Sequence, residues 1–237
     1  MPSPEPSPLE SLDSRLRAFR AAFHRLEVDC PPPVAAPPAS EAQVSAVEAA
    51  LGFGIPASLR AVLLARAARF AFRFSLRRVP PKGWKGLFRK KKNLSPWVEL
   101  PPELEGIFSG ACCWDLDALP ALESTRQVWA ERVFTHPERP AHRLWRGKLA
   151  FQEAPTGDLL ALDLEAPGSP VVYLSQEGGA LHGAVLGASF TDFIDRWSQV
   201  GFAGPEDFQI ERFYTPGAGI DPRGPSALAW RAFLGME

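Results

Sequence analysis

Residues 40–64 read SEAQVSAVEAALGFGIPASLRAVLL, and this stretch predicts two helices joined by a tight turn. Ser40 stands three residues before Gln43, which is the spacing of a capping box in the first turn of a helix. Gly52 suits the left-handed conformation that ends many helices, and Pro56 suits the first turn of the next helix. We therefore expect an αα-hairpin here.

The chain after the hairpin changes from helical to alternating periodicity. Apolar and polar residues alternate along 70–76, which predicts a strand. Helices first, then strands, then a closing helix indicate an α+β fold with a central antiparallel or mixed sheet. The elements expected after the hairpin are a strand at 70–76, a helix at 114–130, strands at 145–151, 158–164 and 170–174, and a helix capped by Ser189.

The expected division of the chain follows its prolines, which number 25 of 237 residues. Residues 1–39 are expected to hold a disordered tail, an amphipathic helix over 9–28 and a proline-rich linker. Residues 40–200 form the predicted domain, with a basic insertion at 77–106. Residues 201–237 form a Pro/Gly-rich extension whose apolar side chains pack back onto the domain.

Four motifs in order resemble a known family. They are the hairpin at 40–59, GDLLALD at 157–163, VVYLSQE at 171–177 and SFTDFI at 189–194. Together they are similar to the SUKH superfamily, which includes the yeast Smi/Knr cell-wall regulators and many bacterial immunity proteins. The resemblance implies a SUKH-like α+β fold and protein binding, commonly neutralisation of a toxin. Two positions depart from the family pattern: Gln176 replaces a histidine, and residues 65–69 replace an Asn-Gly-Gly-like turn.

The sequence lacks the common motifs of catalysis and metal binding. It has no nucleophile elbow, Walker A loop, dinucleotide-binding glycine turn or His-Glu-x-x-His pair. The four histidines are dispersed, and the three cysteines have no zinc-site or disulfide spacing. The best carboxylates are Asp158, Asp163 and Glu177, of which the first two face opposite ways on a strand. We expect a protein that is not an enzyme, with no catalytic residue, cofactor or metal.

Charge is divided sharply along the chain. Residues 60–92 hold twelve lysines and arginines, and no acidic residue occurs between Glu48 and Glu99. The other residues carry a net charge of −13, because the whole chain carries −1. Arginine and tryptophan are enriched at the energetic centres of interfaces. We predict that the partner-binding residues are Arg77, Arg78, Lys82, Trp84, Lys85, Phe88, Arg89, Lys90, Lys91 and Lys92, with Trp84, Arg89 and Lys91 foremost.

Other interpretations of the basic segment stay open. It is also compatible with a solvated loop that keeps an insertion soluble, or with a nucleic-acid contact through residues 60–92. The acidic remainder would repel phosphates, and no RRM, OB or helix-turn-helix pattern is present, which argues against nucleic acid. A membrane-surface contact would normally use a long amphipathic helix, which the segment lacks.

The leading hypothesis is a protein-binding immunity protein that neutralises a co-encoded bacterial toxin by stoichiometric binding. The alternative is a regulatory or scaffold module without a toxin partner. We expect a cytoplasmic location and no membrane insertion, because the sequence has no run of 18 apolar residues and no signal-peptide pattern at its start. A monomer or a small homo-oligomer is expected.

Overall fold

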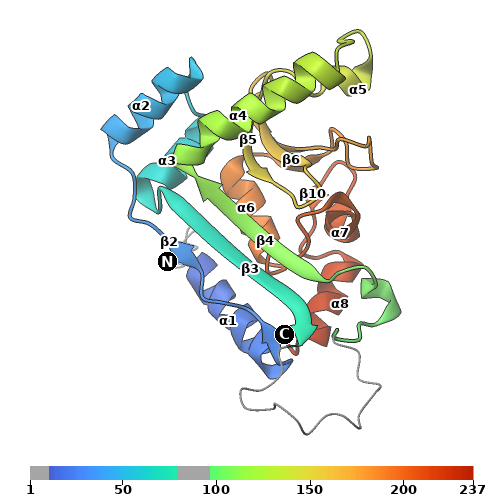
Figure 1. Ribbon diagram of the computed structural model, residues 1–237. Coiled ribbons are helices and arrows are strands. Elements are labelled where there is room, and N and C mark those ends of the chain that lie inside the picture. Colours follow the sequence, from blue (N-terminus) through green and yellow to red (C-terminus); the bar gives the residue numbers. More distant parts are fainter. Residues whose placement is uncertain (1–10, 79–96, 237) are drawn as a thin grey trace, which may run out of the picture.

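A computed structural model describes residues 11–78 and 97–236 of the chain, and these residues form the α+β fold that the sequence predicts (Figure 1). All the strand pairs in the described residues are antiparallel. The helices are α1 (Leu12–Arg25), α2 (Glu41–Leu51), α3 (Ala57–Ala65), α4 (Leu119–Val128), α5 (Pro140–Arg143), α6 (Phe190–Ser198), α7 (Asp207–Ile210) and α8 (Pro225–Phe233). Short helical turns are η1 (Pro102–Leu104), η2 (Leu116–Ala118), the π-helical η3 (Trp129–Val133) and η4 (Glu211–Phe213).

The first sheet is built around the long strand β3 (Arg69–Arg78). Strand β4 (Ser109–Asp115) pairs along one edge of β3. Strands β1 (Val28–Asp29) and β2 (Val34–Ala35) pair with the two ends of its other edge. The strand predicted at 70–76 is therefore confirmed, and it extends further at both ends.

The proline-rich stretch that was expected to be a linker is part of this sheet. Val34 and Ala35 of β2 pair with Ala71 and Phe70 of β3. Prolines flank β2 on both sides, and proline cannot donate a ladder hydrogen bond. This edge of the sheet is therefore poorly suited to adding another strand.

The second sheet contains the three later strands that the sequence predicts. Its order is β5 (Lys148–Glu153), β6 (Leu159–Asp163), β7 (Val171–Leu174) and β8 (Val185–Gly187). Strand β8 was not predicted. A small hairpin of β9 (Tyr214–Thr215) and β10 (Gly219–Ile220) forms a third sheet.

One buried side chain joins the first two sheets. The side-chain oxygen of Gln152 in β5 accepts a hydrogen bond from the Cys113 N–H at 2.9 Å. The amide nitrogen of Gln152 donates to the carbonyl of Ala111 at 3.1 Å. Gln152 is 2% exposed, so its amide replaces part of a strand ladder between β4 and β5.

The predicted helix starts in the hairpin and in α6 are confirmed. The Ser40 hydroxyl accepts a hydrogen bond from the Gln43 N–H, and the Gln43 side chain accepts one from the Ser40 N–H. Gly52 ends α2 in the left-handed conformation, with φ of +80°. Ser189 caps α6 by accepting from the Asp192 N–H.

The helix predicted at 114–130 begins later than expected. Trp114 lies in β4, and the Asp115 carboxylate accepts a hydrogen bond from the Asp117 N–H in η2. The helix α4 starts only at Leu119, with Pro120 in its first turn. Proline suits that position because the first-turn N–H groups have no intrahelical partner.

The main core also includes both ends of the described chain. Leu16, Phe19 and Phe23 of α1 are at most 1% exposed within it. Trp230 of α8 is fully buried, stacks on Phe74 and donates its indole N–H to the Val200 carbonyl at 3.0 Å. Residues on either side of 40–200 therefore share one hydrophobic core with it.

A second, smaller core covers the opposite face of the second sheet. It is formed under α4 and η3 by Ala130, Trp145, Ala150, Leu159, Ala161, Val172 and Leu174. Strands β6 and β7 are consequently buried on both faces. Strand β4 instead alternates between buried and more exposed positions. Figure 1 shows α4 in front of β5 and β6, while the middle of β3 and β4 is left uncovered in that view.

Candidate partner-binding surface

The uncovered face of the first sheet is the candidate partner-binding surface. Residues directly opposite each other in an antiparallel pair project from the same face of the sheet. Phe70, Phe72 and Phe74 of β3 point into the core. The alternate side chains form what we call the open face: Arg69, Ala71, Arg73, Ser75 and Arg77 of β3, with Ser109, Ala111, Cys113 and Asp115 of β4.

Three arginines form a row along the open face. Alternate strand residues project from the same side, so Arg69, Arg73 and Arg77 follow one another at intervals of about 13 Å. Arg69 approaches Asp115 on β4, with 3.4 Å between Nε and Oδ2. Arg73 lies opposite Ala111 instead. Within residues 11–78 and 97–236, neither Arg73 nor Arg77 forms an ion pair.

An aromatic trio lies at the Arg77 end of the open face. The backbone of Trp97 forms an antiparallel bridge with Arg77. The ring centroid of Trp97 lies 6.4 Å from that of Phe108, which in turn lies 6.0 Å from that of Phe208. The exposed fractions of the three residues are 43%, 37% and 46%, in the order Trp97, Phe108 and Phe208. Exposed apolar side chains in mutual contact are typical of interaction surfaces.

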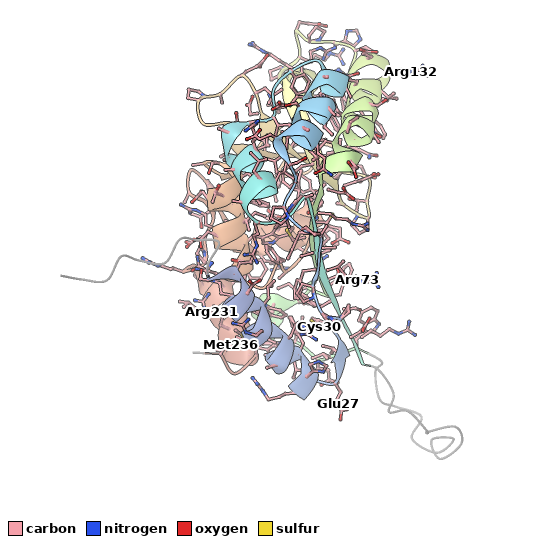
Figure 2. All side chains as sticks on the ribbon, turned by 90° about the vertical axis from the view of Figure 1, so that its left-hand side faces the viewer. Glu27, Cys30, Arg73, Arg132, Arg231 and Met236 are labelled. Carbon is pink, nitrogen blue, oxygen red and sulfur yellow. The ribbon has the colours of Figure 1, made fainter. Side chains whose placement is uncertain are left out.

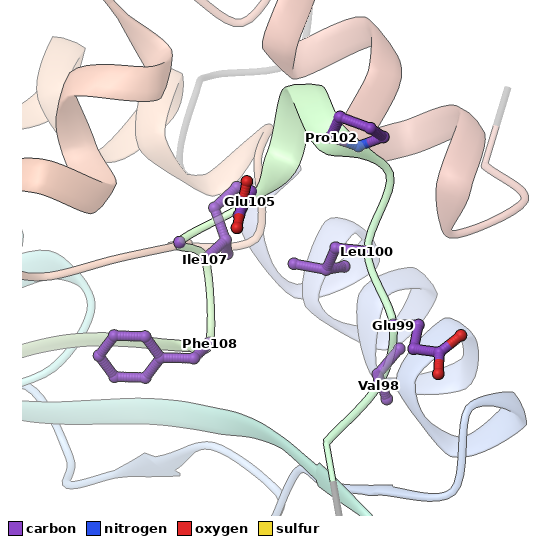
Figure 3. Close-up of a pocket in the computed structure, with 8 residues that line it drawn as sticks. Val98, Glu99, Leu100, Pro102, Glu105, Ile107 and Phe108 are labelled. Carbon is purple, nitrogen blue, oxygen red and sulfur yellow. The ribbon is translucent and has the colours of Figure 1, made fainter. Parts of the chain in front are cut away.

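An open pocket of about 510 Å³ adjoins this trio (Figure 3). Leu100 points into the space between its two walls, and Phe108 stands on the wall opposite Val98 and Glu99. The lining consists of residues from one stretch of chain: Val98, Glu99, Leu100, Pro102, Glu105, Gly106, Ile107 and Phe108. The pocket has the apolar lining of a site for a partner side chain, with two glutamates at its edges.

Only the first two predicted partner-binding residues lie in the described chain. Arg77 and Arg78 are the last residues of β3, and Arg77 is exposed. The predicted contacts at Lys82, Trp84, Lys85, Phe88, Arg89, Lys90, Lys91 and Lys92 fall outside the described residues. Sequence reasoning missed Arg73 as part of the surface, although the alternation along β3 was a usable signal. It also missed the trio, because Trp97, Phe108 and Phe208 share no local pattern.

The three carboxylates considered from the sequence do not form a joint site. Asp158 is buried and accepts hydrogen bonds from the Tyr173 hydroxyl at 3.0 Å and the Gln176 N–H at 2.7 Å. Asp163 pairs with the buried Lys148 ammonium at 2.9 Å. Glu177 is exposed. Each carboxylate therefore has a separate environment, and none of the three faces another as an acid–base pair would.

Burial and the neighbouring charge of Asp158 raise the pKa of Tyr173 well above its ordinary value. The hydroxyl is therefore held in its protonated form, in which it donates to Asp158. Burial also raises the pKa of the Cys112 and Cys113 thiols. Thiols in this state are poor nucleophiles at neutral pH, because the thiolate is the reactive form.

Metal-binding side chains are also separated in the described chain. Among residues 11–78 and 97–236, no three histidine, cysteine, aspartate or glutamate side chains cluster as metal ligands would. The ring centroids of His136 and His142 are 5.8 Å apart, but Nδ1 of His142 accepts a hydrogen bond from the His136 N–H. That nitrogen is already engaged within the chain.

Comparison with models of protein families matches residues 38–196 to the SMI1 / KNR4 family (SUKH-1). The chain belongs to the SMI1/KNR4 family. The match covers the hairpin, strands β3 and β4 of the first sheet, the whole second sheet and nearly all of α6, so the family resemblance seen in the four sequence motifs is confirmed. Comparison with curated proteins and with solved structures gave no significant match.

The structure explains the family motif at the turn before β6. The Gln176 side-chain amide donates a hydrogen bond to the Gly157 carbonyl, and the Gln176 N–H donates to Asp158. Gln176, which replaces the usual histidine of the SMI1/KNR4 pattern, thus retains a side-chain donor for this turn. These motif residues have structural roles within this turn.

The SMI1/KNR4 match begins after α1 and ends before α7. Helices α1, α7 and α8 therefore lie outside it. Figure 1 shows α1 and α8 beside the first sheet, and both contribute to its core. Within the described parts of the chain, no helix has the length and apolar character needed to cross a bilayer.

Proposed function

We propose that this chain is a protein-binding domain that neutralises a co-encoded bacterial toxin by forming a stoichiometric complex with it. The match of residues 38–196 to the SMI1/KNR4 family carries the proposal, because bacterial members of the SUKH superfamily are commonly immunity proteins. Neutralisation would proceed by occlusion: a preformed surface covers the active site or substrate path of the toxin, with the affinity set by a few anchors.

The proposed mechanism needs no catalysis by this chain. The separate environments of Asp158, Asp163 and Glu177 support that view, as do thiols held in their protonated form. The proposed contacts are the sequence-predicted basic residues from Arg77 to Lys92, with Trp84 and Phe88 as aromatic anchors. An acidic protein surface is the complementary partner for such residues.

Co-expression with the product of the adjacent gene tests this function. A 1:1 complex together with restored growth is the expected result. No complex and no rescue would contradict toxin neutralisation and favour the regulatory or scaffold role. A gene neighbourhood without a toxin gene would point the same way.

A double variant tests the proposed anchors separately. Trp84→Ala/Phe88→Ala should weaken toxin binding at least tenfold while the melting temperature stays nearly unchanged, because truncated interface anchors cost several kcal/mol. Leu228→Ala is a matched control, since Leu228 is 54% exposed on α8. Unchanged affinity in the double variant would remove the anchors from the interface without contradicting the family assignment.

A further inference from the structure

In the described parts of the chain, the first sheet differs from the second in having one face that no helix covers. Strand β4 alternates in burial along its length, whereas β6 and β7 are buried throughout their central residues. In Figure 2, the sheet is seen from its side, with α1 on one side of β3 and Arg73 on the other. The described chain thus covers the inner face of this sheet and leaves the outer face available.

The side chains of this open face leave its arginines accessible. Arg73 faces Ala111 across the strand pair, and the next pairs along the sheet are Ala71 with Cys113 and Ser75 with Ser109. Small side chains on both sides allow another protein to approach the strands closely, between the arginines. The open face therefore combines long arginine side chains with small residues between them.

Positive charge exceeds negative charge on this surface. Among the described residues, Arg69 alone of the three arginines has a carboxylate within 4 Å, that of Asp115. Asp29 on β1 lies opposite Ser75 and makes no ion pair with a described residue.

We infer that the open face, with Arg73 near its middle and Arg77 at one end, is the docking surface for an acidic protein partner. This inference rests on the proposed function and specifies which face of the domain meets the toxin. The arginines steer and orient an acidic surface, because complementary charge accelerates encounter and fixes register. Trp97, whose backbone is bridged to Arg77 at this end of the face, supplies an apolar contact that charge alone does not provide.

The charge of the chain outside residues 60–92 favours a protein over a nucleic acid as the partner. The net charge of −13 outside residues 60–92 adds repulsion for any long polyanion that extends beyond this face. An acidic protein surface of limited size avoids that repulsion.

A cysteine in the middle of the open face provides a direct footprint. Cys113 is exposed, whereas Cys30 and Cys112 are buried. Docking on this face should therefore slow alkylation of Cys113 by iodoacetamide, which is followed at alkaline pH because the raised pKa of this thiol makes the reaction slow at neutral pH. We expect the rate to fall at least tenfold in the saturated complex with the adjacent gene product. Cys30 and Cys112 serve as internal controls, because they are inaccessible in both states.

Charge reversal tests the arginines themselves. Arg73→Glu should raise the Kd for the adjacent gene product at least tenfold at low salt, and the difference should shrink in 0.5 M NaCl. Arg132→Glu is the matched control: it makes the same change of charge on η3, at the far end of the molecule from Arg73 in Figure 2. Both side chains are exposed, so both variants should keep the melting temperature of the parent.

The outcomes separate this inference from the proposed function. A stable complex in which Cys113 reacts at its free rate, with equal Kd values for Arg73→Glu and Arg132→Glu, would overturn the docking face and leave toxin neutralisation intact. The absence of any complex would contradict the proposed function. The open face would then be tested with two probes, poly-L-glutamate of about 20 residues and a single-stranded oligonucleotide of equal charge. Protection of Cys113 by the polypeptide would support the docking face. Stronger protection by the oligonucleotide, or no protection by either probe, would overturn it.

Discussion

The side chain of Gln176 holds the backbone carbonyl of Gly157, which closes the turn before β6 against the end of β7. Gly157 has a φ of +87°, and a Cβ atom there would lie 2.4 Å from Nε2 of Gln176. The backbone conformation therefore favours glycine at this position, and an added Cβ would also displace the Gln176 amide from the carbonyl that it holds.

Replacing Gly157 with alanine should lower the free energy of unfolding by about 2–3 kcal/mol, from left-handed strain and a displaced hydrogen bond. Gly178→Ala is the control, because Gly178 has a φ of +73° with nothing within 4 Å of an added Cβ. The free energy of unfolding of this control should fall by only about 1–2 kcal/mol, which is the cost of the left-handed strain. Urea unfolding measures both variants, and equal losses would contradict a role for the Gln176 contact.

The seam between the two sheets gives a second prediction. Gln152→Leu removes the partners of the Cys113 N–H and the Ala111 carbonyl, and unsatisfied groups of this kind cost about 1–3 kcal/mol each. The variant should unfold at lower urea concentration and lose hydrogen-exchange protection at the Cys113 amide. Glu153→Leu, at the exposed end of the same strand, should change stability by less than about 0.5 kcal/mol. Unchanged protection at Cys113 would mean that the sheets are held together without this bridge.

The ion pair on the buried side of α4 is expected to show strongly non-additive losses of stability when its two partners are replaced. The guanidinium of Arg126 contacts the Glu123 carboxylate at 2.6 and 2.9 Å, and both side chains are less than 10% exposed. Arg126→Met leaves a buried carboxylate without its partner and should cost about 3–5 kcal/mol. The double variant Glu123→Met/Arg126→Met should be more stable than Arg126→Met alone, although the Trp145 carbonyl loses a donor in both. A double variant with the summed loss of the two single variants would contradict this prediction.

The sequence was most informative where local rules determine structure. The Ser40 capping box and the left-handed Gly52 were predictable because their hydrogen bonds and φ angles involve neighbouring residues. Strands β5, β6 and β7 were predictable because each is an apolar run between turn sequences. Strand β4 was missed because SGACCWD has small residues at most positions and few β-branched or aromatic ones.

Long-range packing explains what the sequence did not reveal about the candidate surface. The periodicity of β3 shows that Arg73 and Arg77 share a face, but which face stays uncovered depends on where α4 packs. The aromatic trio brings together residues from separate segments of the chain, so no spacing in the sequence predicts that they are in contact. The proline-rich stretch around Val34 read as a linker because its pairing partner lies far along the chain in β3.

The turn around α5 is expected to respond to pH through His142. Nδ1 of His142 accepts a hydrogen bond from the His136 N–H at 3.2 Å, which requires an unprotonated Nδ1. Burial, followed by the positive charge of Arg139, lowers the pKa of His142 below 6.5; His136 and Arg146 act in the same direction, and Glu138 opposes them. Because the unfolded chain binds the proton more readily, the contribution of His142 to stability increases with pH up to about 6.5 and is lost as the pH falls through the lowered pKa.

The amide proton shift of His136 reports this change directly. We expect it to titrate with a midpoint below 6.5, as protonation of His142 removes the acceptor. The Arg139 amide is the internal control, since it donates to the backbone carbonyl of His136, which does not titrate. In His142→Phe the midpoint should disappear from the His136 amide. A midpoint at or above 6.5 in the parent protein would show that burial and the surrounding arginines do not lower the pKa of His142.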